Sequence, residues 1–227
     1  SSEYFGCITD FKCISEYFDI IQPDLVFHLA AQPIVIDSYS NPKLTFEVNG
    51  QGTLNILELA RLSPKQVAVV NVTSDKCYAN KERVYGYHEE DNLGGDDPYS
   101  ASKAVSEIIT NAYLQSFGDE NFRVVTARSG NVIGGSDFSA YRIVPDIISK
   151  ISKGDDIVIR NPNAVRPWQH VLEPISGYLL LASKILSNEY TVYQGSYNFG
   201  PLVTSTNSVL SLTRDCIDFF GSKVGLS

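Results

Sequence analysis

Residues 67–72 read Val-Ala-Val-Val-Asn-Val, and the residues that follow them, 73–78, read Thr-Ser-Asp-Lys-Cys-Tyr. A short and almost wholly apolar run rich in valine is typical of a strand that a parallel sheet buries on both faces. In an open α/β sheet, ligands bind outside the carboxyl ends of the strands. We therefore expect Ser74, Asp75 and Lys76 to face a ligand.

A second stretch, residues 99–103, reads Tyr-Ser-Ala-Ser-Lys and opens a helix that the pattern predicts over residues 98–117. Side chains four residues apart lie on one face of a helix, so Tyr99 and Lys103 should be neighbours. A nearby ammonium favours the ionised phenol, which lowers the pKa of Tyr99 from its usual value of about 10 and makes it a usable base. An arbitrary Tyr-x-x-x-Lys is more often a pair of exposed helix residues, but Asp75 at a strand end reverses that preference. Together the two stretches predict a site that takes a proton from a sugar hydroxyl.

Predicted strands and helices alternate along the first part of the chain. The strands lie at residues 24–29, 67–72 and 122–127, and the helices at residues 13–21, 49–61 and 98–117. This alternation predicts an α/β fold with a doubly wound parallel sheet of the Rossmann type. His28, inside the first strand, is expected to be a buried core histidine.

After residue 135 the pattern becomes less regular. Helices are predicted at residues 145–153, 173–186 and 207–220, with Ser205 or Thr206 as the cap of the last one. Short strands are predicted at residues 157–159 and before the pair Gly200-Pro201. We expect residues 1–135 to form an incomplete NAD-binding domain and residues 136–227 to form mainly a smaller α/β substrate domain that is interleaved with the first.

Composition limits the classes of function. The chain has 227 residues, 43% of them hydrophobic and 19% charged, which is typical of a globular protein. Its net charge of −8 repels nucleic acid and anionic membranes, and no apolar run reaches the ~20 residues of a membrane span. The four cysteines lie far apart without a histidine cluster, so we expect reduced thiols in a cytoplasmic protein and no metal site. The chain has no methionine and starts within a helix-like pattern, so we expect it to be the later part of a longer α/β protein.

Five segments, in this order, resemble the extended short-chain dehydrogenase/reductase family and, within it, the CDP-glucose 4,6-dehydratases. They are His-Leu-Ala-Ala-Gln-Pro at 28–33, Thr-Ser-Asp-Lys-Cys-Tyr at 73–78, Gly-Gly-Asp-Asp-Pro-Tyr-Ser at 94–100, Arg-Ser-Gly-Asn-Val-Ile-Gly-Gly at 128–135 and Arg-Pro-Trp-Gln-His-Val-Leu-Glu-Pro at 166–174. Tyr-x-x-x-Lys alone recurs by chance. The second and fifth segments are far more specific.

The resemblance implies a hydro-lyase of deoxysugar biosynthesis, of the kind that supplies lipopolysaccharide, which turns CDP-glucose into CDP-4-keto-6-deoxyglucose with a tightly bound NAD. In this reading Tyr99 takes the proton of the C4 hydroxyl, Ser74 binds the same oxygen, and Asp75 protonates the departing C6 hydroxyl. Lys76 stands where related dTDP-glucose enzymes have a glutamate base. It must be neutral when it acts, relay a proton through water, or stabilise an enolate, and its role stays open.

The same resemblance implies a set of binding residues. Lys103 would also hold the nicotinamide ribose, and the other cofactor contacts would be Ile8, Ala30, Ala31, Gln32, Asn49, Thr73 and Tyr99. Asn131 and Arg166 match positions at the sugar diphosphate, where the planar fork of an arginine suits phosphate, and His170 is a further substrate contact. The Gly-rich turn that seats the pyrophosphate is absent, so a molecule of these residues alone should hold NAD poorly. Cys7 stands where the family usually has an aspartate for adenine, so adenine recognition stays open.

Two other functions remain open beside the dehydratase. One is a nucleotide-sugar 4-epimerase or reductase that uses Tyr99 and Ser74 alone, and the other is a non-catalytic remnant that binds a nucleotide or a partner subunit. The Asp75-Lys76 pair argues against the epimerase, since epimerisation needs no acid for a C6 hydroxyl. Related enzymes pair through the helix at residues 98–117 and the one after Gly50, so we expect a homodimer or a larger homo-oligomer. The face expected to point outward there carries Ala104, Ile108 and Ala112.

Overall fold

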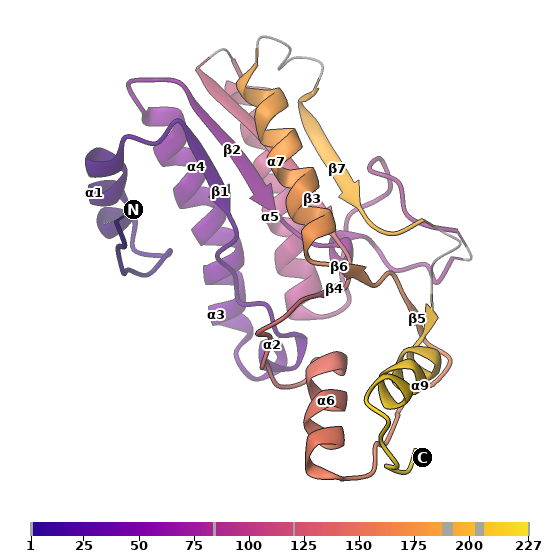
Figure 1. Ribbon diagram of the computed structural model, residues 1–227. Coiled ribbons are helices and arrows are strands. Elements are labelled where there is room, and N and C mark those ends of the chain that lie inside the picture. The colour runs from indigo at the N-terminus through magenta and orange to yellow at the C-terminus, as the bar shows by residue number, and fades with distance from the viewer. Residues whose placement is uncertain (1, 84, 120, 188–192, 203–206, 227) are drawn as a thin grey trace. The chain divides into compact units, whose positions relative to one another are not determined.

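The chain forms two compact units. The computed structural model describes residues 2–83, 85–119, 121–187, 193–202 and 207–226 (Figure 1). One unit consists of residues 1–129 and 175–199, and the other of residues 130–174 and 200–227. The chain therefore leaves the first unit after Ser129 and returns to it at Ile175.

A four-stranded parallel sheet forms the centre of the first unit. In spatial order the strands are β1 (Leu25–His28), β2 (Val67–Val72), β3 (Phe122–Ser129) and β7 (Gly195–Phe199). In the register of the sheet Val26 pairs with Val69, which pairs with Val124 on its other side. The predicted α/β fold with a parallel sheet is confirmed, and β3 runs two residues beyond its predicted end.

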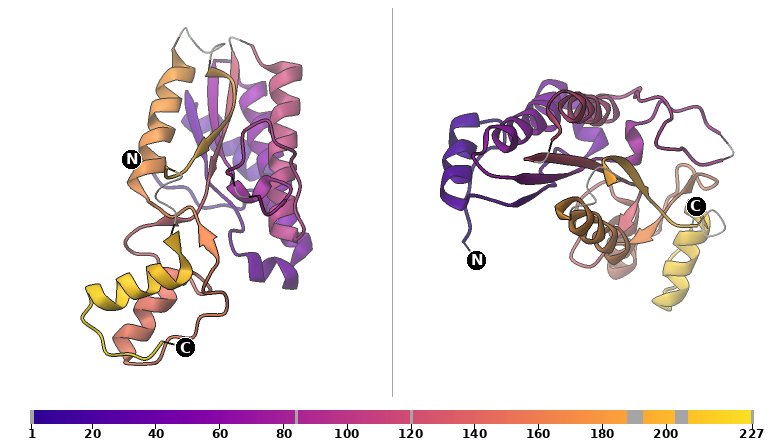
Figure 2. Two further views of the ribbon diagram at one scale, coloured as in Figure 1. Left: turned by 90° about the vertical axis from the view of Figure 1, so that its right-hand side faces the viewer. Right: turned by 90° about the horizontal axis from the view of Figure 1, so that it is seen from above.

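Helices cover both faces of this sheet, as the two views of Figure 2 show. On one face lie α4 (Gly52–Leu62) and α5 (Pro98–Phe117), and on the other lies α7 (Leu172–Leu186). α1 (Phe11–Ile21) packs on α4. The core between these layers includes Leu57, Val69, Val124 and Ile185, each fully buried, and burial of such apolar surface is the main force that holds the layers together. Among the described residues, no helix has both the length and the apolar character that a membrane crossing requires.

The helical region before α4 begins earlier than predicted. α2 (Val35–Ser40), α3 (Pro42–Phe46) and a π-helical stretch, η1 (Glu47–Gln51), lead directly into α4. Pro42 suits the first turn of α3 because the missing N–H would have no partner there. In α2 and α3 the buried residues are polar, Ser38 and Thr45. The apolar stripe that marks a helix in sequence is therefore missing from them.

Over its described residues the second unit has two helices and two short strand pairs. α6 (Ile143–Lys153) packs on α9 (Val209–Phe219). β4 (Val132–Ile133) pairs in parallel with β6 (Gln169–His170), and β5 (Val165–Arg166) pairs antiparallel with β8 (Asn207–Ser208).

Two predictions for this unit are wrong. No strand forms at residues 157–159, where Ile157 alone makes an isolated bridge to Leu226 and the side chain of Val158 is exposed. An apolar triplet without a partner strand gains nothing from extended pairing. The helix α9 begins at Val209 and its cap is Ser208, whose Oγ accepts from the N–H of Ser211 at 3.1 Å. The predicted caps at residues 205 and 206 lie outside the described residues.

Candidate functional site

The segment that follows β2 turns sharply at the carboxyl edge of the sheet. Thr73 still donates its N–H to the carbonyl of Ala127 at 2.9 Å, and the 3₁₀ turn η2 (Asp75–Cys77) begins two residues later. Ser74 caps this turn: its Oγ accepts from the N–H of Lys76 at 3.2 Å and lies 3.1 Å from Oδ1 of Asp75. The Ser74 hydroxyl and the Asp75 carboxylate therefore form one hydrogen-bonded pair.

The members of this segment differ in exposure. Thr73 and Ser74 are buried, Asp75 is half-buried and Lys76 is exposed. A half-buried carboxylate can meet a ligand on one side while the fold holds it on the other. The exposed Lys76 lies beside it in sequence, and its position decides none of the three roles that the sequence left open.

α5 starts at the same edge with a well-formed cap. Asp97 accepts from the N–H of Ser100 at 2.9 Å and from its hydroxyl at 2.6 Å, which is the usual capping role of an aspartate at a helix start. The N–H of Tyr99 donates to Oγ of Ser38 at 3.2 Å, which ties the first turn of α5 to α2. A Cβ on Gly95 would lie 2.4 Å from the backbone nitrogen of Ala101, so only glycine fits where the chain enters this helix.

Tyr99 and Lys103 both lie on the buried side of α5, with side chains 8% and 6% exposed. The Nζ of Lys103 donates to the carbonyl of Val72 at 3.5 Å, a long bond, and it is the only one the ammonium makes within the described residues. Burial lowers the pKa of Lys103 to about 8, against the opposing effect of the Glu107 carboxylate. The ammonium therefore stays mostly charged at neutral pH and has N–H groups left for a ligand.

A third loop approaches from the end of β1. The N–H of Gln32 donates to Oδ1 of Asn49 at 2.8 Å, and the carbonyl of Gln32 accepts from Nδ2 at 3.2 Å. Asn49 also donates to Oγ of Ser102 at 2.8 Å. Ser102 in turn donates to the carbonyl of Tyr99 at 2.7 Å. One buried amide thus fixes the loop after β1 against the helix that carries Tyr99.

The residues of this loop differ in exposure. Ala30 is exposed, and Ala31 and Gln32 are half-buried. Ile8 is half-buried and packs on α4. Its carbonyl accepts from Nδ2 of Asn55 at 2.9 Å, and its side chain lies against Gly52. Neither contact involves the Ile8 N–H.

The three predicted substrate residues of the second unit lie on its short strands and the loop before them. The carbonyl of Asn131 accepts from the N–H of Gln169 at 2.9 Å, and His170 pairs with Ile133 in the β4–β6 ladder. Nδ1 of His170 accepts from the N–H of Leu172 at 3.3 Å. Arg166 is exposed on β5.

Several residues that support the site were not predicted from sequence. Ser38 lies in a helix with no apolar stripe. Glu107 and Arg128 form a buried ion pair next to the Thr73–Tyr78 segment. The available signal for the pair was position: Glu107 follows Lys103 by one helical turn, and Arg128 lies near the end of an apolar strand, where an unpaired charge would be costly.

Known proteins that are similar to this chain include nucleotide-sugar dehydratases and epimerases. The GDP-mannose 4,6 dehydratase family model matches residues 4–217. A CDP-glucose 4,6-dehydratase from Salmonella typhimurium is 39% identical over 224 residues, which is 96% of this chain and 62% of that protein. A UDP-glucose 4-epimerase from Mycoplasma genitalium is 26% identical over 98% of this chain and 68% of its own length. The chain thus spans less than two thirds of the Salmonella protein.

Solved structures show the same fold. A UDP-glucose 4-epimerase from Thermus thermophilus, in complex with NAD, matches 98% of this chain and 70% of its own with a TM-score of 0.82 at 24% identity. A dTDP-glucose 4,6-dehydratase variant from Streptomyces venezuelae matches 98% of this chain and 65% of its own with a TM-score of 0.80 at 23% identity. At these identities the structures establish the Rossmann-type fold. With the match over residues 4–217, the chain belongs to the GDP-mannose 4,6-dehydratase family of nucleotide-sugar enzymes.

Proposed function

We propose that the protein containing this chain is a nucleotide-sugar 4,6-dehydratase that converts CDP-glucose to CDP-4-keto-6-deoxyglucose. The observation that carries the proposal is the arrangement at the end of β2. Lys103 donates to the carbonyl of Val72, and three residues later the Asp75 carboxylate is hydrogen-bonded to Ser74. A helix with a tyrosine and a lysine and a turn with an acid therefore meet at one strand end. The printed function of the 39% identical Salmonella relative, a CDP-glucose 4,6-dehydratase, supports the choice of substrate.

The residues at this edge have the chemistry that such a reaction needs. The Lys103 ammonium favours the ionised phenol of Tyr99, which then takes the proton of the C4 hydroxyl, and Ser74 donates to the same oxygen. A ketone at C4 acidifies the proton at C5. In its protonated form Asp75 gives its proton to the C6 hydroxyl, which leaves as water while the C5 proton is removed, so the hexose loses one molecule of water overall. Lys76 is exposed next to Asp75 in the same turn, and its candidate roles are the three named from the sequence.

The donor set fits the nicotinamide half of NAD. Lys103 has N–H groups to spare, the loop has small side chains at Ala30 and Ala31, and Thr73 and Asn49 border the same edge. We infer that Lys103 and Tyr99 hold the nicotinamide ribose and that the loop lines the cofactor. When bound, NAD supplies the reversible oxidation at C4 and the reduction at C6. Cys7, exposed beside Ile8, offers no carboxylate for adenine.

The sugar diphosphate is proposed to bind the second unit. Asn131, Arg166 and His170 lie on or next to its short strand pairs. The exposed Arg166 guanidinium donates only to the carbonyl of the neighbouring Val165, at 2.8 Å, among the contacts described. Its other N–H groups suit phosphate oxygens.

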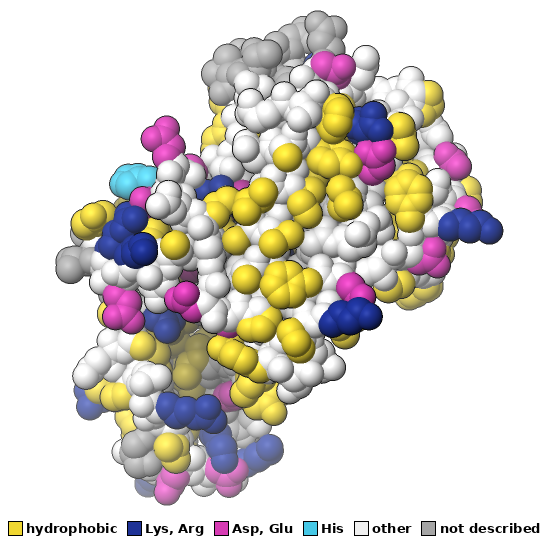
Figure 3. All heavy atoms as spheres, turned by 180° about the vertical axis from the view of Figure 1, so that it is seen from behind, with side chains coloured by type: hydrophobic (Ala, Val, Ile, Leu, Met, Phe, Trp, Pro, Cys, Tyr) yellow, Lys and Arg dark blue, Asp and Glu magenta, His cyan; other side chains and the backbone are white. Residues whose placement is uncertain are grey.

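We also propose that the protein forms a homodimer or larger homo-oligomer in the cytoplasm. Apolar side chains gather on the face seen in Figure 3, over α4 and α5. Exposed apolar residues on α3, α4 and α5 are Leu44, Phe46, Leu62, Ile108 and Phe117. The predicted outward face is correct for Ile108 and Ala112 and wrong for Ala104, which is buried against Cys77 and Tyr78.

The test is to incubate the intact protein with NAD and CDP-glucose and to measure the near-ultraviolet absorbance of a 4-keto sugar in alkali. We expect this absorbance from the wild type, and a loss of about 10²-fold or more in turnover for Tyr99→Phe with unchanged circular dichroism. Asp75→Asn should also block elimination. A product that has kept its water and inverted C4 would establish the epimerase instead. No turnover of any nucleoside diphosphate hexose would refute the proposal.

A further inference from the structure

Among the described residues of the first unit, the most deeply buried charges are those of Glu107 and Arg128. Their side chains are 1% and 4% exposed, and Nη2 of Arg128 lies 2.7 Å from Oε2 of Glu107. A buried ion pair is weak evidence for stability, because apolar residues of similar volume often stabilise a fold as well or better. The contacts of the pair therefore indicate its role better than its burial does.

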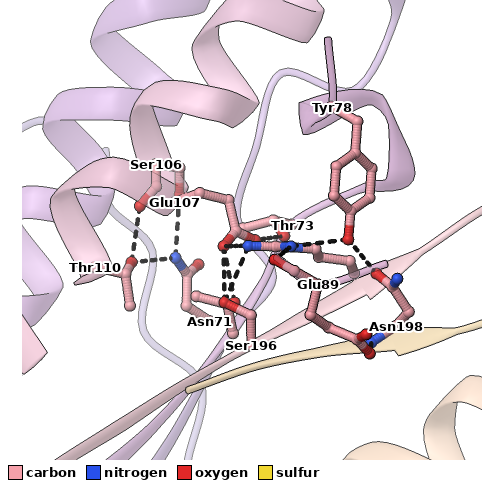
Figure 4. A network of polar contacts seen from close by, with 11 residues as sticks. Asn71, Thr73, Tyr78, Glu89, Ser106, Glu107, Thr110, Ser196 and Asn198 are labelled. Atoms are coloured by element: carbon pink, nitrogen blue, oxygen red, sulfur yellow. Dashed lines mark hydrogen bonds and ion pairs between the residues drawn. The ribbon is translucent and has the colours of Figure 1, made fainter. Parts of the chain in front are cut away.

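Each partner holds one end of the segment that carries the proposed acid (Figure 4). The Thr73 hydroxyl donates to Oε1 of Glu107, and Nη1 of Arg128 donates to the Tyr78 hydroxyl at 2.8 Å. The Arg128 guanidinium also lies over the Tyr78 ring, 5.0 Å from its centre. Ser74, Asp75 and Lys76 lie between these two anchors. The turn is thus fixed at both ends to one ion pair.

One member of the pair also lies on the helix that carries the proposed base. Glu107 lies on α5, one turn after Lys103 and two turns after Tyr99, on the same buried side. Arg128 lies on β3, the strand next to β2. The pair is therefore a direct physical link between the helix of Tyr99 and the turn of Asp75.

Further hydrogen bonds keep the Tyr78 anchor in place. Its hydroxyl donates to Oδ1 of Asn198 at 2.6 Å, and the N–H of Asn198 donates to Oε1 of Glu89 at 2.7 Å. Nη1 of Arg128 donates to the carbonyl of Glu89 at 3.0 Å. These bonds form a closed network (Figure 4), and a closed network holds one geometry where a single bond would allow several.

We propose that Glu107 and Arg128 are positioning residues that set the distance between the base on α5 and the acid after β2. The inference rests on the proposed function, because it concerns the two residues that the proposed reaction uses as base and acid. A displacement of about 1 Å can cost about 10²-fold in rate, so loss of an anchor should lower kcat more than it changes KM.

Two variants separate positioning from mere structure. Tyr78→Phe removes a hydroxyl that accepts from Arg128 and donates to Asn198. Ser196→Ala on β7 is the matched control, because it also removes a hydroxyl with two partners. Oγ of Ser196 accepts from Arg128 at 3.0 Å and lies 3.4 Å from Oε2 of Glu107. Only Tyr78 belongs to the segment with the acid. Both variants of the intact protein are compared for circular dichroism, for kcat and KM with CDP-glucose, and for hydrogen exchange of the amides of residues 76–78.

For Tyr78→Phe we expect kcat to fall about tenfold or more, KM to stay within about threefold, and amide exchange at residues 76–78 to rise about tenfold. Ser196→Ala should keep kcat within about twofold. Unchanged exchange in Tyr78→Phe overturns the inference, and so does equal loss of kcat in both variants or an unchanged kcat in Tyr78→Phe.

Failure of the proposed function has a different result. If the wild type turns over no nucleoside diphosphate hexose, the proposed reaction is refuted, and the positioning role is refuted with it. The exchange data would then still report whether the ion pair holds the turn, because they need no substrate.

Discussion

Replacement of His28 by glutamine should make the first unit less sensitive to acid. His28 ends β1 with its side chain 5% exposed, as the sequence predicted for a core histidine, and its Nε2 lies 3.2 Å from Oγ1 of Thr53. The Thr53 hydroxyl donates its own proton to the carbonyl of Asn49 at 2.7 Å, so its oxygen must accept from the histidine. Nε2 therefore carries the proton of a neutral imidazole. A second proton would place an unpaired charge in the core.

The size of the effect follows from the pKa. Burial, with a smaller contribution from the charge of Lys103, lowers the pKa of His28 from 6.5 to about 4. Between these values the unfolded chain binds a proton that the folded chain does not, so stability falls as the pH falls. The linkage relation gives a loss of about 2 kcal/mol between pH 7 and pH 5, and about 3 kcal/mol below pH 4.

The assay is urea unfolding followed by circular dichroism at pH 7, 6 and 5. Carboxylates contribute to the acid sensitivity of wild type and variant alike, so the difference between the two isolates His28. We expect His28→Gln to lose about 2 kcal/mol less than the wild type between pH 7 and pH 5. His88→Gln, at an exposed histidine, is the matched control and should behave as the wild type does. An identical loss in His28→Gln and wild type would refute the reasoning.

Substitutions at three further positions test the entrance and the charge of α5 by urea unfolding. Asp97→Ala removes both bonds to Ser100 and should cost about 1 kcal/mol, whereas Asp97→Asn should restore most of it; equal stability of the two would contradict the cap. Gly95→Ala should cost about 1–3 kcal/mol, because its Cβ would meet the backbone of Ala101, and a neutral result would show that the corner can relax. Lys103→Met should raise the unfolding free energy at pH 7 by about 1–3 kcal/mol while abolishing turnover, since it removes a buried charge whose pKa is lowered to about 8. It should also remove the rise in stability that the wild type shows as pH increases from 8 to 10.5, and the persistence of that rise would contradict the assignment to Lys103.

Residues with a strong periodic pattern were predictable, and residues positioned by distant contacts were not. β2 and α5 have the bounds that their patterns predict, since a buried valine run and a proline-started helix are decided locally. The turn after β2 followed from the general rule for open α/β sheets. The stretch at residues 157–159 shows the opposite case, because a strand needs a partner and its own sequence does not reveal whether one exists.

The site was predictable as a set of residue types but not as a set of contacts. Tyr99, Lys103 and the Asp75 turn stand out because charged and phenolic groups interrupt apolar patterns. The tethers between them do not stand out: Asn49 joins the loop after β1 to Ser102, and Ser38 holds the first turn of α5. Both act through hydrogen bonds between segments that are distant in sequence, and no local pattern encodes such pairing.

The wrong orientation of Ala104 has the same physical origin. Ala104, Ile108 and Ala112 were expected to point outward because related enzymes pair through this helix, but Ala104 is buried against Cys77 and Tyr78. In the structure the buried stripe of α5 is polar, and it runs through Tyr99, Ser102, Lys103, Ser106, Glu107 and Thr110.

Burial of that polar stripe is tolerated because its members have partners. Ser106 contacts Thr53 at 2.9 Å and accepts from Asn71 at 3.0 Å, and Asn71 donates to Thr110 at 2.8 Å. An unsatisfied polar group in the same place would cost about 1–3 kcal/mol. On this face of α5, hydrogen bonds take the place of apolar packing, and they continue from the sheet to Glu107 and the proposed site. A helix whose inward stripe is polar and hydrogen-bonded to its neighbours is fixed in rotation as well as in position, and a tyrosine base must be fixed in both to reach one hydroxyl of a hexose.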